Sequence, residues 1–89
     1  MNHRAKIALA LIVGLCLSAG CQTNSRLRLV GMRALDSGDI ETADASFTRA
    51  VERQPADWKS LYYLGLVRLE QGRPIDAQVN LEQAYGIRD

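Results

Sequence analysis

The chain has 89 residues, 47% of them hydrophobic and 24% charged, which is enough for one small folded core but not for two. Lys and Arg number 11 against 10 Asp and Glu, so the basic excess typical of nucleic-acid binding is missing and we expect no nucleic-acid partner. Two cysteines and one histidine are too few for a disulfide framework or a His/Cys metal site, and we expect no metal.

The first residues have the layout of a secretory signal. Arg4 and Lys6 precede an apolar run over residues 7–17, and the small residues Ser18, Ala19 and Gly20 follow it. This apolar run is too short to span a bilayer as a helix. We therefore exclude residues 1–20 from the fold and expect them to be removed.

The segment that ends in Ser18, Ala19, Gly20 and Cys21 resembles a bacterial lipobox. The resemblance implies that Cys21 is diacylated and that the chain is cut before it. Ser18 departs from the leucine most often found there, and Cys16 is a poorer candidate because bulky Leu15 precedes it. Two alternatives stay open: a plain secretory signal with a chance cysteine, and an uncut amino-terminal anchor.

Lipidation at Cys21 would fix the location of the chain. Two acyl chains hold a protein stably on a bilayer, whereas one binds only marginally. By resemblance to Gram-negative lipoproteins, Gln22 after the cysteine implies the outer membrane, facing the periplasm. Residues 21–25 would then be the lipidated end and a short tether, with the covalent lipid as the only attached group.

The rest of the chain repeats itself at an offset of thirty-four residues. Both copies carry Gly or Ala at four matched places, and apolar residues at the other four. The matched pairs are Leu27 and Leu61, Val30 and Leu64, Gly31 and Gly65, Leu35 and Leu69, Gly38 and Gly72, Ala43 and Ala77, Phe47 and Leu81, and Ala50 and Ala84.

Apolar residues three and four positions apart predict four amphipathic helices. The first carries Leu27, Val30, Gly31, Ala34 and Leu35 on one face, and the others are expected over about 40–53, 58–71 and 74–86. Asp39 and Asp57 are expected to cap the second and third helices, and Glu52 to lie on the surface. Short turns would make neighbouring helices antiparallel, which gives two stacked hairpins.

This pattern resembles the tetratricopeptide repeat. Repeat one (24–57) supplies Gly31, Ala43, Phe47, Ala50 and Pro55, and repeat two (58–89) supplies their counterparts except the proline. Both repeats lack the family's first-helix Trp and Tyr, and the second stops two residues short. The resemblance implies an all-α fold, two stacked antiparallel helical hairpins of an α-solenoid after the signal segment.

About three repeats and a polar cap are usually needed for an independently stable solenoid. The second repeat has no cap in this chain, so we expect the outer face of the fourth helix to receive a partner. The candidate residues are Val79, Leu81 and Tyr85.

The concave groove is the other candidate surface, because first-helix side chains line it in this family. Met32 and Leu66 offer adaptable apolar contact, and Tyr62 is suited to interfaces. Arg28 and Lys59 would meet an acidic or polar ligand. The alternative is that Met32 belongs to the core and that both cations are simply solvated.

The predicted mature chain has no histidine, free thiol, phosphate-binding glycine loop or activated serine, so we expect no catalysis and no small-molecule substrate. One hypothesis is an accessory subunit or assembly factor of a secretion or pilus complex of the envelope, as in relatives of this class. The other is a self-associating adaptor that binds a peptide or helix in its groove. The partner is accordingly another envelope protein or a second copy of the chain.

Overall fold

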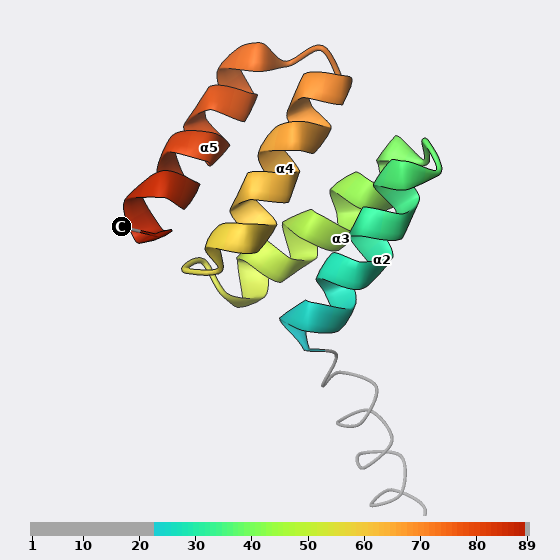
Figure 1. The fold of residues 1–89 in the computed structure, drawn as a ribbon, viewed down its shortest axis with the longest axis horizontal. Helices are drawn as coiled ribbons and strands as arrows, with labels where there is room; N and C mark the ends of the chain where they lie inside the picture. Colours follow the sequence, from blue (N-terminus) through green and yellow to red (C-terminus); the bar gives the residue numbers. More distant parts are fainter. Residues whose placement is uncertain (1–22, 89) are drawn as a thin grey trace, which may run out of the picture.

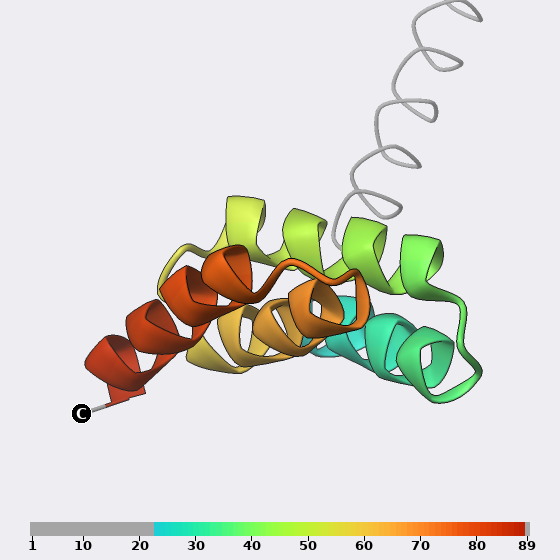
Figure 2. The same ribbon diagram turned by 90° about the horizontal axis from the view of Figure 1, so that it is seen from above.

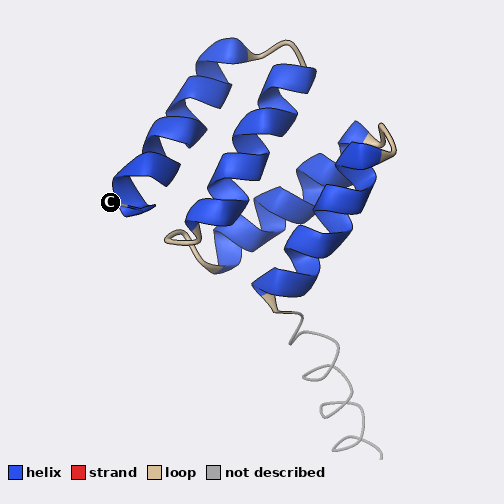
Figure 3. Ribbon diagram, in the orientation of Figure 1, coloured by secondary structure: helices blue, strands red, loops and turns tan. Residues whose placement is uncertain are grey.

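The computed structural model describes residues 23–88, and these residues fold as four α-helices without strands (Figures 1 and 3). The helices are α2 (Asn24–Asp36), α3 (Ile40–Arg53), α4 (Trp58–Glu70) and α5 (Pro74–Arg88). The all-α prediction is confirmed. The predicted signal segment and Cys21 lie outside the described residues.

Local polar contacts set where the helices begin. The carboxylates of Asp39 and Asp57 accept hydrogen bonds from the amides of Thr42 and Ser60, as predicted for N-caps. The hydroxyl of Thr23 does the same for Arg26 at the start of α2, a cap that was not predicted.

The first and third helices end at glycines, as the sequence predicts. Gly38 and Gly72 adopt φ values of 80° and 72°, in the left-handed region that side chains with a Cβ disfavour. Their amides bond back to the carbonyls of Leu35 and Leu69. The two tight turns therefore reverse the chain in the same way.

The helices form two hairpins that lie side by side. Helix α2 packs against α3, α4 packs against α5, and α3 joins the hairpins by packing against α4. Helices α2 and α5 consequently lie at opposite ends of the row in both views (Figures 1 and 2). None of the helices within residues 23–88 is long and apolar enough to cross a membrane.

A cluster of buried apolar side chains spans the contact between the hairpins. It consists of Ala34, Ala43, Phe47, Leu64 and Val67, which come from α2, α3 and α4. The predicted inner residues of α3, Ala43, Phe47 and Ala50, are all fully buried. Burial of this α3 face explains why the two hairpins stay together.

One prediction about α2 is wrong in the structure. Val30 was expected on the buried face, yet it is 50% exposed, whereas its repeat equivalent Leu64 is only 5% exposed. Leu64 lies on the side of α4 that meets α3. Among the described residues no helix precedes α2 to cover Val30 in the same way.

Candidate functional site

Four of the five predicted groove residues line one open cleft. Arg28 and Met32 of α2 lie on one side and Lys59, Tyr62, Tyr63 and Trp58 of α4 on the other, around a volume of about 410 Å³. Leu66 is half-buried and does not line the cleft. The cleft combines one exposed lysine, the apolar side chain of Met32 and three aromatic rings, a composition suited to contact with a protein or peptide.

The aromatic side chains of the cleft are held by packing. Tyr63 stacks on buried Phe47 with ring centroids 5.2 Å apart and an interplanar angle of 9°. Tyr62 meets Tyr63 edge to face at 5.4 Å. This contact leaves Tyr62 at the surface while Tyr63 anchors it to the core. The rigid placement favours Tyr62 as a contact residue for a partner.

Tyr62 also lines a smaller pocket between α4 and α5. Its other walls are Trp58, Ala84, Tyr85 and Arg88. The guanidinium carbon of Arg88 lies 5.3 Å from the Trp58 ring centre, and Lys59 Nζ lies 5.8 Å from it, both within cation–π range. This pairing was not predicted from the sequence, because the fourth helix was expected to end at about residue 86, two residues before Arg88.

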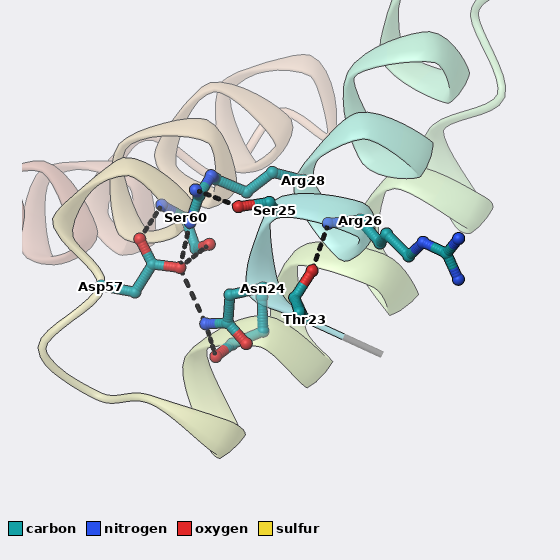
Figure 4. Close-up of polar contacts among 8 residues, drawn as sticks. Thr23, Asn24, Ser25, Arg26, Arg28, Asp57 and Ser60 are labelled. Carbon is teal, nitrogen blue, oxygen red and sulfur yellow. Dashed lines mark hydrogen bonds and ion pairs between the residues drawn. The ribbon is translucent and has the colours of Figure 1, made fainter. Parts of the chain in front are cut away.

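Arg28 has a role that neither sequence alternative anticipated. Its guanidinium nitrogen lies 2.6 Å from Asp57 Oδ2, and the Asp57 side chain is only 7% exposed (Figure 4). Asn24 Nδ2 donates to the same carboxylate and to the carbonyl of Ala50. Arg28 thus belongs to a polar contact between α2 and the start of α4, and its charge is largely neutralised there.

Asp57 therefore does more than cap a helix. Burial raises the pKa of its carboxyl, but hydrogen bonds from Ser60 and Asn24 and the charge of Arg28 outweigh burial and lower the pKa overall. Ser60 contributes both its amide and its hydroxyl (Figure 4). Ionised Asp57 thus ties the two repeats together at one end of the hairpin contact.

A second polar network ties the repeats together at the other end. Arg68 and Gln71 of the second hairpin both donate to Asp44 Oδ2, at 2.9 and 2.8 Å. Burial raises the pKa of the Asp44 carboxyl, but hydrogen bonds from Gln71, Thr48 and Arg68 outweigh burial and lower the pKa overall. The carboxylate is therefore held ionised between the two hairpins.

The predicted partner-binding residues of α5 do not form one face. Successive residues of a helix are turned by about 100°, so Val79 and Leu81 point to nearly opposite sides. Leu81 is half-buried, and its side chain fills the space beside Gly65. Val79 and Tyr85 are exposed, but only Tyr85 joins the pocket with Trp58.

No family model, curated protein or solved structure matches the chain. The fold and its surfaces are therefore the grounds for assigning a role.

Proposed function

We propose that the chain is a lipid-anchored tetratricopeptide-type protein whose role is to bind another protein, as an accessory subunit or assembly factor of a secretion or pilus-type complex in a bacterial envelope. The proposal combines the lipobox-like segment before Cys21 with the two-hairpin fold. It places the mature chain on the outer membrane, facing the periplasm, with lipid as its only attached group and no catalytic role.

The observation that carries the interaction role is the apolar surface on the α4–α5 hairpin. Leu69 of α4 and Tyr85 of α5 are both exposed. Their repeat equivalents in the first hairpin, Leu35 and Val51, pack against one core cluster. Exposed apolar side chains that gather on one side of a small protein commonly mark an interface. We infer that a protein covers this side in the assembled state.

A second candidate function uses the cleft between α2 and α4. Here the chain would act as an adaptor that holds a peptide or helix of a transient partner against Met32, Lys59 and Tyr62. Lys59 is exposed, in contrast to Arg28, so it is the cation best placed to meet an acidic ligand. This candidate is favoured by the fixed aromatic wall of the cleft.

Lipid attachment is tested by metabolic labelling with palmitate in a Gram-negative host. We expect Cys21→Ser to abolish the label and to release the chain from membranes. Cys16→Ser is the matched control and should keep the label, because Leu15 makes Cys16 a poor lipidation site. A labelled Cys21→Ser chain would contradict the anchoring model.

The interaction role is tested by placing a photo-crosslinking amino acid at Tyr85 of the full chain in native membranes. Arg49, on the exposed side of α3, is the control position. We expect a discrete protein adduct from position 85 and none from 49. The same probe at Tyr62, compared with and without Lys59→Glu, tests the cleft. Absence of any protein adduct from positions 85 and 62 would overturn the interaction role.

A further inference from the structure

The internal repeat shows what kind of element fits the exposed side of α5. In the first hairpin, Leu35, Ile40 and Val51 pack against the cluster that contains Phe47, and α4 covers this side. One repeat later, the equivalents of these three residues are Leu69, Pro74 and Tyr85. The equivalent of Phe47 is Leu81. Leu81 packs partly against Gly65 of α4, but no described helix follows α5 to cover this side as α4 covers α3. Leu69 and Tyr85 are accordingly 49% and 56% exposed. These residues of the α4–α5 hairpin are therefore spaced to pack against a helix that resembles α4.

The chain itself carries such a helix at its other end. The side of α4 that meets α3 includes the apolar residues Tyr63, Leu64 and Val67. The equivalents in α2 are Leu29, Val30 and Arg33, all of them exposed. Two of the three are apolar. The third is an arginine, whose aliphatic stem can lie over an apolar surface while its charged end reaches water.

We propose that α2 of a second copy docks on the α4–α5 hairpin of the first and continues the stacking of α4 on α3. Each chain then supplies both halves of one contact, the α2 surface (Leu29, Val30 and Arg33) and the α5 surface (Leu69, Pro74, Leu81 and Tyr85). This inference rests on the proposed interaction role and identifies the partner as another copy of the chain.

The polar positions at the new junction are compatible with this pairing. Arg28 of α2 is already paired with Asp57, and Asp76 of α5 is already paired with Arg73, so neither is an unpaired charge at the contact. Within the chain, Gln71 of one hairpin bonds Asp44 of the other. The equivalent positions at the new junction are Ser37 and Gln78, both exposed and both polar. Because both side chains are uncharged, the junction places no like charges against each other at this site.

Helices α2 and α5 lie at opposite ends of the molecule (Figures 1 and 2). Docking of α2 on α5 is therefore heterologous, and it leaves each pair with one free surface of each kind. Such a contact predicts chains of copies longer than dimers, whereas pairing of α5 with α5 would stop at two. The difference can be measured.

The test uses the full chain in detergent-solubilised membranes, with a photo-crosslinking amino acid at Ile75, which is 77% exposed at the start of α5, and with two different epitope tags. One variant carries Val30→Asp, which blocks the α2 surface, and the other carries Tyr85→Asp, which blocks the α5 surface. Both positions are exposed, so the fold should tolerate the change, and circular dichroism checks this. Val79→Asp is the control, because Val79 is 51% exposed on the same helix but is equivalent to Ala45, which stays exposed in the first hairpin.

We expect a ladder of oligomers from the unchanged chain and from Val79→Asp. For each blocked variant alone, the yield of crosslinked oligomers should fall by roughly tenfold or more, since a charge must be buried in the contact. The mixture of the two blocked variants should give a mixed dimer and nothing larger, because one intact surface of each kind remains.

The proposal is overturned if Val30→Asp associates like the unchanged chain, which would mean symmetric pairing through α5, or if the unchanged chain gives no adduct between its two tags. A discrete adduct of Tyr85 with a different protein would overturn self-docking while the proposed interaction role stands. If position 85 gives no protein adduct of any kind, the docking role of α5 fails together with self-docking.

Discussion

Gly31 lies directly against the ring of Phe47, and a Cβ added at Gly31 would come within 2.6 Å of the Phe47 Cζ. One repeat later, Gly65 meets Leu81 in the same way, at 2.8 Å. Each hairpin therefore brings its helices together through a glycine facing a large apolar side chain. The glycine costs about 1 kcal/mol of helix propensity relative to alanine, which the close approach offsets.

This relationship predicts a graded response to alanine at the three glycines. Gly31→Ala should lower the free energy of unfolding by about 1–2 kcal/mol, because Phe47 is fully buried and cannot move aside. Gly65→Ala should cost less, since the half-buried Leu81 can change rotamer. Gly86→Ala is the control and should be neutral or stabilising by up to about 1 kcal/mol, as nothing lies near its Cβ position.

Urea unfolding followed by circular dichroism measures this series. Equal losses for Gly31→Ala and Gly86→Ala would contradict the packing argument, because only the first introduces a clash.

Acid should weaken the fold through Asp57. Its pKa is lowered in the folded state, so its contribution to stability is fully present above its unfolded pKa, near 3.8, and is lost as the pH falls through the folded pKa. Asp44 and Asp39 act in the same direction. We therefore expect the free energy of unfolding to fall steeply below about pH 4.

Asp57→Asn tests this assignment. It should cost about 1–3 kcal/mol at pH 7, because the paired carboxylate is lost from Arg28 and Asn24, and it should flatten the pH dependence below pH 4. Asp76→Asn is the control, since Asp76 pairs only with exposed Arg73 within one turn. An unchanged acid slope in Asp57→Asn would refute the assignment.

Asp44 and Arg68 should be energetically coupled across the two hairpins. Their side chains are partly buried and 2.9 Å apart, so a double-mutant cycle with alanine should give a coupling of about 0.5–1.5 kcal/mol. The exposed Arg73 and Asp76 pair should give about 0.5 kcal/mol or less. If the two cycles gave the same value, Asp44 would not contribute to the contact between the hairpins.

The sequence was sufficient to predict the helices because the repeat places the same residue types at the same turns. Gly38 and Gly72 mark the helix ends, Asp39 and Asp57 the caps, and Phe47 the core. These features depend on residues close in the chain or on the repeat register. The helix boundaries follow from them directly.

The surfaces were harder to predict, because they depend on contacts between residues far apart in the chain. The pairing of Arg28 with Asp57 joins α2 to the N-cap of α4, 29 residues away in the chain, and it turns an expected groove cation into an internal contact. Arg88 reaches Trp58 because α5 extends to Arg88, two residues past the end expected from the sequence. The spacing of Val30 predicts a core residue, but Val30 is exposed because no described helix packs on its side of α2.

Covering the α5 surface within the chain should stabilise the fold. Residue 89 is the repeat equivalent of Pro55, so a copy of residues 56–72 fused after Asp89 continues the register and places a second α4-like helix over Leu69, Leu81 and Tyr85. Burying the exposed parts of these side chains should raise the free energy of unfolding by about 2 kcal/mol. The fused helix should also abolish the oligomer ladder.

Gln78→Asp in the fused chain provides a sharper test, because it recreates the Asp44 position opposite the copied Arg68 and Gln71. We expect a further gain of about 0.5–1 kcal/mol in the fused chain and no gain in the original chain. A fused chain whose copied helix carries Asp at the positions of Leu64 and Val67 is the control and should gain nothing. Equal stability of the fused and control chains, measured by urea unfolding, would show that the α5 surface does not accept an α4-like helix.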